Sequence, residues 1–390
     1  MAGLRQIAAV TAVNLAGLSQ RLWTSLVIVV GMACVVGVLL SMLSFSAGLA
    51  RSIESAAAPD RAIVIRNGGR DEYGTAITRE AVVAISNAPG MRKDEDGQPI
   101  ASAENLNNTP VIRRDGRLPV RMVLRGVGPK VLALRPELRL VSGRMFRPGT
   151  HELIAGTAAQ AQFEGLGVGD KVIMPDGEWE IVGSFETGGD LLEGQVLGDA
   201  ETVMASRRSP GFGSLIVRLE SPDAFDSFAS ALRANPALDV DVQRQSDFYA
   251  QSAGQFTNFF TTIAYMLGSI IAVGALFGTV NIMHSAVASR TREIATLRAL
   301  GYGAAPVAIS VLAEALFLAI VGTVIGAAVA WLLFDGNRNS WGGFVVFDLA
   351  ITPRLLLIGT LWALSIAFLG AVIPAIRAAR LQVATALRPV

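Results

Sequence analysis

Long apolar stretches and one long polar stretch divide this chain. The apolar runs cover residues 22–50, 259–285, 306–334 and 355–376, and the polar stretch lies between the first two runs. A helix needs about 20 mostly apolar residues to cross the hydrocarbon core of a bilayer. The pattern therefore predicts a membrane protein with four transmembrane α-helices and a large extracytoplasmic α/β domain between helices 1 and 2.

The same pattern predicts an order of segments along all 390 residues. We expect a cytoplasmic or interfacial helix over 1–21, transmembrane helix 1 over 22–50, the external domain over 51–246, a stalk and transmembrane helix 2 over 247–288, a charged cytoplasmic segment over 289–303, transmembrane helix 3 over 304–334, an external loop over 335–354, transmembrane helix 4 over 355–376 and a cytoplasmic tail over 377–390.

Two features of the first 50 residues leave alternatives open. Residues 2–20 permit an interfacial amphipathic helix, and a frayed terminus explains them equally well. Residues 47–50, Ala-Gly-Leu-Ala, faintly suggest a cleavage site. The apolar run before them is longer than the roughly 7–15 residues of a signal-peptide core, which favours an uncleaved membrane anchor.

Alternation of apolar and polar residues predicts the elements of the external domain. A strand, a helix and a strand are expected near its start, and the same order recurs near its end, which suggests a pseudo-repeat whose strands share one sheet. The stretch between them is rich in glycine and turns, so we expect a β-rich lobe inserted over about 150–208. The expected elements are strands at 61–66, 100–106, 171–174, 179–182, 214–219 and 238–242, and helices at 78–87 and 222–234.

The distribution of charge predicts the side of the membrane that each segment occupies. The net charge is only +1, but basic residues outnumber acidic ones in 1–25, 289–303 and 377–390. Acidic residues outnumber basic ones in 51–258. The positive-inside rule then places both termini and the 289–303 segment in the cytoplasm, and the large domain outside.

The charged segment at 289–303 stands between two apolar runs. A charged, helix-favouring insert of this length cannot lie in hydrocarbon, so it must lie at a membrane face. It is expected to be a short helix on the cytoplasmic surface, exposed to a partner. Its charges alone favour the simpler interpretation, a solvated, positive-inside loop.

Three groups of motifs point to a known family. Residues 289–301 read Ser-Arg-x-Arg-Glu-Ile-x-x-x-Arg-Ala-Leu-Gly, and the tail contains Pro-Ala-x-Arg-Ala-x-x-Leu from 374 and Ala-Leu-Arg from 386. The external domain contains Gly143-Arg-Met-Phe, Glu152-Leu-Ile-Ala-Gly and Leu166-Gly-Val-Gly-Asp-Lys-Val. Together these motifs resemble the MacB/FtsX-like permeases, the membrane subunits of the mechanotransmission class of ABC transporters, with a MacB-like periplasmic core domain.

The resemblance implies partners and a task. It implies a permease subunit of the bacterial inner membrane that pairs with a second permease, identical or different. It also implies a separate cytoplasmic ATPase subunit, which would bind ATP and Mg²⁺ and move the external domain. The family uses such motion for efflux with a periplasmic adaptor and an outer-membrane channel, for lipoprotein release, or for regulation of a cell-wall hydrolase. The residues expected to contact the ATPase are Arg290, Arg292, Glu293, Leu297 and Arg298.

Within the membrane, one acid and two glycine pairs are candidates for a role. Glu314 lies deep in the third apolar run, where a carboxylate is costly unless it is paired or protonated. It is either functional or a hydrogen-bonding link to a neighbour such as Asn281. Gly274 with Gly278, and Gly322 with Gly326, would let helices approach closely, although glycine is common in membrane helices.

The sequence offers little for catalysis. It has two histidines, expected on opposite sides of the membrane, and one cysteine. Residues 165–171 have the look of a phosphate loop but lack its Gly-Lys-Ser/Thr ending, and no Walker motif occurs. We therefore expect a non-catalytic subunit without a cofactor, metal or nucleic acid of its own. The alternative is a membrane-anchored sensor or scaffold with a ligand-binding ectodomain and no ATPase partner.

Overall fold

The computed structural model describes residues 2–18, 22–73, 76–114, 116, 119–174, 176–335, 338–341, 345–349 and 351–381. The chain divides into two compact units. The first, here called the helical unit, comprises Met1–Ser46, Asn258–Asn337 and Ala350–Val390. The second, here called the α/β unit, comprises Ala47–Thr257 and Arg338–Leu349.

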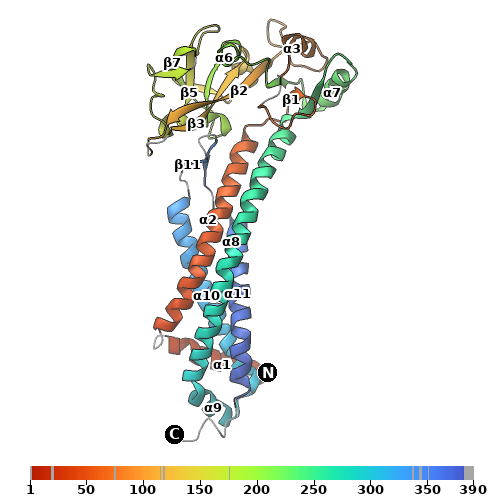
Figure 1. The fold of residues 1–390 in the computed structure, drawn as a ribbon. Helices are drawn as coiled ribbons and strands as arrows, with labels where there is room; N and C mark the ends of the chain where they lie inside the picture. Colours follow the sequence, from red (N-terminus) through yellow and green to blue (C-terminus); the bar gives the residue numbers. More distant parts are fainter. Residues whose placement is uncertain are drawn as a thin grey trace. The chain divides into compact units, whose positions relative to one another are not determined.

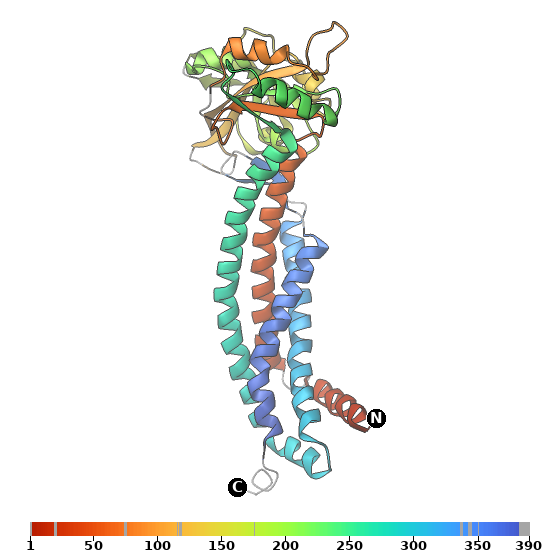
Figure 2. The same ribbon diagram turned by 90° about the vertical axis from the view of Figure 1, so that its right-hand side faces the viewer.

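Four long helices run alongside one another in the helical unit (Figure 2). Among the described residues, these four are long and apolar enough to cross a membrane, which confirms the expected number. A shorter helix precedes them and another links the second to the third. The helices are α1 (Ala2–Ala16), α2 (Leu22–Ser55), α8 (Gln245–Ser289), α9 (Thr291–Ala299), α10 (Ala304–Phe334) and α11 (Pro353–Ala379).

One ten-stranded sheet forms the centre of the α/β unit. Its strand order is β10-β1-β9-β2-β3-β8-β5-β7-β4, and β6 pairs with β7 beside β4. The pairs β3–β8 and β5–β7 are parallel, and the other pairs are antiparallel. The strands are β1 (Arg61–Arg66), β2 (Ala101–Ile112), β3 (Pro119–Val127), β4 (Arg139–Gly143), β5 (Glu152–Gly156), β6 (Lys171–Met174), β7 (Gly177–Glu186), β8 (Val196–Asp199), β9 (Ser214–Arg218) and β10 (Val240–Arg244).

Short helices cover the sheet and connect its strands. They are α3 (Arg79–Ser86), α4 (Val131–Leu134), α5 (Thr157–Gln162), η2 (Leu191–Gly194), α6 (Ala200–Arg207), η3 (Pro222–Ala224) and α7 (Phe225–Arg233). Thr78 caps α3, because its side chain accepts a hydrogen bond from the backbone N–H of Ala81.

The first lobe of the α/β unit consists of β10, β1, β9 and the start of β2, with α3 and α7 (Figure 1). Strands from the two ends of the domain are neighbours here, so the prediction that the two repeats share a sheet is confirmed. Ile85 of α3 and Phe228 and Leu232 of α7 are buried in one core with residues of β1 and β9. The apolar stripe on α7 therefore faces the sheet.

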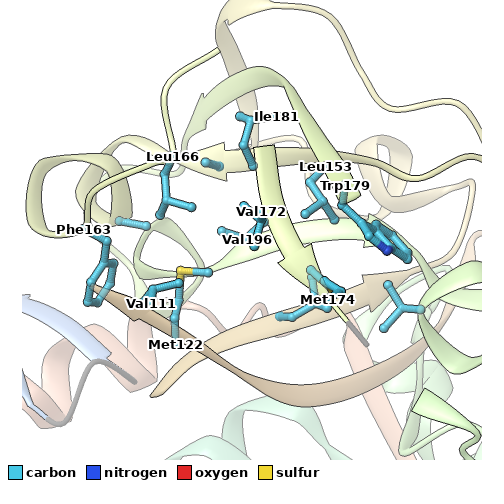
Figure 3. Close-up of a cluster of buried hydrophobic side chains, with 14 residues drawn as sticks. Val111, Met122, Leu153, Phe163, Leu166, Val172, Met174, Trp179, Ile181 and Val196 are labelled. Carbon is cyan, nitrogen blue, oxygen red and sulfur yellow. The ribbon is translucent and has the colours of Figure 1, made fainter. Parts of the chain in front are cut away.

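The second lobe has its own core around Trp179 and Phe163, both fully buried (Figure 3). Val111 of β2 and Met122 of β3 belong to this core. The predicted start of this lobe, near residue 150, is therefore too late. β2 runs through both lobes, because it pairs with β9 up to Glu104 and with β3 from Asn105 onward.

Two other segments differ from expectation. Helix α2 continues past residue 50 to Ser55. The expected external loop over 335–354 contains a hairpin of β11 (Arg338–Trp341) and β12 (Val345–Asp348), which belongs to the α/β unit and lies against η2.

Candidate functional site

The candidate site is centred on α9, the short helix predicted from the charged segment. Its end is set by Gly301, whose φ of 95° lies in the left-handed region that favours glycine. The Tyr302 N–H donates to the Leu297 carbonyl, and the Gly301 N–H donates to the Arg298 carbonyl. This pair of bonds is the Schellman arrangement, which satisfies the last carbonyls of a helix and ends it. The chain can therefore turn directly from α9 into α10.

A buried ion pair joins the start of α9 to α10. The Nη2 of Arg290 donates to both carboxylate oxygens of Glu314, at 2.5 and 2.6 Å. Only 6% and 5% of these two side chains are exposed. The suggested link from Glu314 to Asn281 is thus wrong, since Asn281 is exposed and Arg290 is the partner of Glu314. Arg290, which we expected to face an ATPase, instead fixes α9 to α10.

A second contact joins the end of α9 to the end of α11. The Nη1 of Arg298 donates to the carbonyls of Ala379 and Leu381, at 2.9 and 2.7 Å. The last carbonyls of a helix carry partial negative charge, so a guanidinium is stabilised there. Nearby, Arg377 of α11 contacts Nδ1 of His284 on α8 at 3.4 Å. Both ends of α9 are therefore fixed to long helices.

The other predicted residues of α9 lie on different sides of the helix. Arg292 and Glu293 are exposed and Leu297 is half-buried, whereas Ile294 is buried. The exposed stripe continues to Leu300, of which 72% is accessible. The exposed side of α9 therefore carries two charged groups and one large apolar side chain.

A groove runs beside α9 and is walled on one side by α1. It has a volume of about 330 Å³, and its lining is largely apolar, with charged groups at Arg290 and Glu293. The amide of Asn14 on α1 donates to the hydroxyl of Ser310 on α10 at 2.8 Å, which holds the wall in place. Sequence reasoning missed this role of α1, because the partner of Asn14 is far along the chain. The apolar lining comes from Val10, Val13, Val287, Ile294, Leu297, Val307 and Val311.

The two glycine pairs of the membrane helices have different surroundings. A Cβ added to Gly326 would lie 2.5 Å from the carbonyl oxygen of Ala33, and one added to Gly322 would lie 2.7 Å from Cβ of Met32. This pair therefore lets α10 pack closely on α2. A Cβ added to Gly274 or Gly278 would meet no described atom within 4 Å.

Gly274 and Gly278 line an apolar groove of about 390 Å³ between α8 and α2. Gly31 of α2 lies on its other side. Because these glycines have no side chain, the groove has room for side chains of another helix.

Other sites for chemistry are sparse in the described part of the chain. No group of three or more His, Cys, Asp and Glu residues there could hold a metal ion. His151 stacks on Trp179 with 4.7 Å between ring centroids and lies 3.3 Å from a carboxylate oxygen of Asp176. We interpret this trio as side-chain packing against the buried Trp179.

Two family profiles together match most of the chain, in the order of its two kinds of segment. Residues 22–235 match the family profile of the MacB-like periplasmic core domain, and residues 265–383 match that of the FtsX-like permease C-terminal domain. The lipoprotein-releasing system transmembrane protein LolC of Xylella fastidiosa is 26% identical over 307 residues, which are 68% of this chain and 72% of LolC. The pyoverdine export ATP-binding/permease protein PvdT of Pseudomonas fluorescens is 34% identical over 132 residues, 32% of this chain and 19% of PvdT.

Two solved structures are also similar to parts of the chain. The periplasmic region of MacB from Actinobacillus actinomycetemcomitans has a TM-score of 0.37 and 15% identity, covering 50% of this chain and 92% of that one. The extracellular domain of the transporter YknZ from Gram-positive bacteria has the same score and identity, covering 47% and 99%. The first family profile alone spans more than half of the chain. This chain is therefore an integral membrane protein with a periplasmic domain, and it belongs to the MacB/FtsX-like permease family.

Proposed function

We propose that this chain is the permease subunit of an ABC transporter, which couples ATP hydrolysis on a separate subunit to movement of its periplasmic domain. The observation that carries the proposal is α9, a charged helix held at both ends and exposed along one side. The family assignment supports the same function. ATP and Mg²⁺ would be bound by the partner, which also performs the hydrolysis.

The two contacts of α9 explain how a push on it would reach the membrane helices. Arg290 connects it to α10 through Glu314, and Arg298 connects it to α11. Separating a buried ion pair leaves uncompensated charge in an apolar environment, which costs several kcal/mol. A displacement of α9 would therefore move α10 with it rather than break this pair, and the hydrogen bonds of Arg298 connect the same helix to α11.

The groove between α1 and α9 is the seat we propose for the ATPase. Its apolar lining would receive apolar side chains of the partner. Glu293 in its lining and the exposed Arg292 on the same helix would select the partner by charge. The excess of basic residues in this part of the sequence supports a cytoplasmic position, and thus an inner-membrane permease with both termini inside.

A second permease subunit would pack at the groove lined by Gly274 and Gly278. These glycines are open, whereas Gly322 and Gly326 are already occupied by α2. Membrane helices associate where small residues let backbones come close. The partner at this groove would be a second copy of this chain or a related permease.

The names of two relatives suggest two classes of cargo. LolC is named for lipoprotein release and PvdT for pyoverdine export. The alignment with LolC extends over the larger part of this chain, which favours release of a lipid-anchored protein over export through an adaptor and an outer channel.

Exchange of the charges on α9 tests the ATPase seat. In the double variant Arg292→Glu/Glu293→Arg the net charge is unchanged but its pattern is reversed. We expect the tagged protein to lose a co-purifying ATP-hydrolysing subunit. A matched control is Asp226→Arg/Arg233→Glu, which makes the same exchange on the exposed side of α7. A partner retained by the α9 variant would contradict the seat, and a partner without ATPase activity would favour the sensor or scaffold.

A further inference from the structure

A cleft of about 350 Å³ lies between the two lobes of the α/β unit. One wall is formed by α3, which packs in the core of the first lobe. The facing wall is the start of α6, which contributes Val203 to the core of the second lobe, and the floor comes from β2 and β9. Neither α9 nor any of the four long helices lines this cleft, so it is separate from the proposed coupling site.

The lining of the cleft is mostly apolar and rich in small side chains. Ala101 and Ala103 of β2 and Ala200 of α6 line it, together with the buried Phe212 and Leu215. Clefts of roughly 300–1,000 Å³ with an apolar lining and a few polar groups are common binding sites for small molecules. This cleft is near the lower end of that range, which fits a small ligand with an apolar body.

Two charged residues meet at the cleft, one from each wall. The Nη2 of Arg79 on α3 donates to Glu201 of α6 at 2.5 Å, and its Nε donates to both carboxylate oxygens at 3.1 and 3.2 Å. The third charged residue of the lining, Asp199, already accepts hydrogen bonds from the backbone N–H groups of Gly149 and Thr202. Arg79 and Glu201 are therefore the charged groups that a ligand in the cleft can bind.

The ion pair between Arg79 and Glu201 can be separated at little cost, because 62% and 53% of the two side chains are exposed. Once separated, the guanidinium needs an anion and the carboxylate needs a cation. An α-amino acid carries both charges on one carbon, so its carboxylate and ammonium groups fit between two residues that now touch. We propose that this cleft binds an apolar α-amino acid as its zwitterion, with Arg79 binding the carboxylate, Glu201 the ammonium, and the side chain against the apolar floor.

This arrangement defines which ligands the cleft would reject. A ligand with one charge would leave either Arg79 or Glu201 without its new partner. A hydrogen bond to a charged group is strong enough that its loss weakens binding by about tenfold or more. An amino acid with a polar side chain would lose the hydrogen bonds of that side chain to water without replacement at the apolar floor.

Calorimetric titration of the full-length protein in nanodiscs tests the site, with L-phenylalanine as the probe. We expect saturable binding with one site per chain. Phenethylamine lacks the carboxylate and 3-phenylpropionate lacks the ammonium, so each should bind at least about tenfold more weakly. Empty nanodiscs are titrated in parallel to subtract partition of the probes into lipid.

Variants then locate the binding within the cleft. Arg79→Gln and Glu201→Gln should each weaken phenylalanine binding by at least about tenfold, and both should keep the melting temperature of the parent because they change surface residues. Ala103→Leu fills the floor and should abolish binding although both charges remain. If Ala103→Leu does not fold, the two charge variants decide. The matched control Arg66→Gln removes one side of a similarly exposed pair with Asp239 and should leave binding unchanged.

Three results would overturn the proposal. Absence of saturable phenylalanine binding by the folded protein would show that the cleft receives another occupant, such as a segment of a protein. Equal affinity for phenylalanine and its two singly charged analogues would show that the charges take no part. Unchanged binding in both charge variants would place the amino acid elsewhere. No nucleotide or ATPase takes part, so these results do not depend on the proposed transporter function.

Discussion

Removal of one partner from the Arg290–Glu314 pair should be among the most damaging single changes in the helical unit. The Nη2 of Arg290 lies within 2.6 Å of both oxygens of Glu314, and hardly any of either side chain is exposed. Breaking a buried ion pair on one side costs about 3–5 kcal/mol, because the remaining charge stays buried and unpaired. We expect this loss for Glu314→Gln and for Arg290→Met.

The double variant Arg290→Met/Glu314→Met is the informative one. It replaces both charges by apolar side chains, and such replacements of buried pairs are often neutral or stabilising. The free energy of unfolding should therefore fall by several kcal/mol less in the double variant than the sum of its decreases in the two single variants. The measurement is reversible unfolding in mixed micelles with increasing SDS, followed by far-ultraviolet circular dichroism. Single losses below about 1 kcal/mol, the value typical of surface pairs, would refute the argument.

Three further changes probe helix packing, self-association and pH dependence. Gly326→Ala places a methyl group against Ala33 and should destabilise the helical unit by about 1–3 kcal/mol in the same assay. Gly278→Ala should leave the single chain unchanged but weaken its self-association, measured by sedimentation in detergent. Hydrogen bonding from Arg144 lowers the pKa of Glu152 from 4.5 to about 2. This stabilisation is complete above pH 4.5 and lost as the pH falls through about 2, so Glu152→Gln should flatten the acid side of the melting-temperature profile.

The elements that sequence predicted best are those fixed by local pattern. The four apolar runs could form only long helices, and the charged segment expected over 289–303 contains α9, which ends before the left-handed Gly301. The strands and helices of the first lobe followed from alternation and from the apolar stripe of α7.

The errors of prediction concern contacts between distant residues. The polar run from Asn105 to Thr109 hid the second half of β2, because cross-strand partners, not local propensity, hold it in the sheet. Arg290 and Glu314 belong to different helices, so residue spacing within one helix cannot predict their pairing. The ion pairs of Arg125 with Glu72 and Glu104 could not be predicted either. They are buried in the structure, whereas charged residues are expected at the surface when only the sequence is known.

The proposed binding of an ATPase to α9 can be tested at a single position. A photo-crosslinking amino acid at Thr296, which lies on the exposed side of α9, tests it most directly in living cells. The same amino acid at Leu361, exposed in the middle of α11, is the control. We expect an adduct at Thr296, absent at Leu361, whose partner binds and hydrolyses ATP. An adduct with a protein that does not bind ATP, or no adduct in a correctly inserted protein, would contradict it.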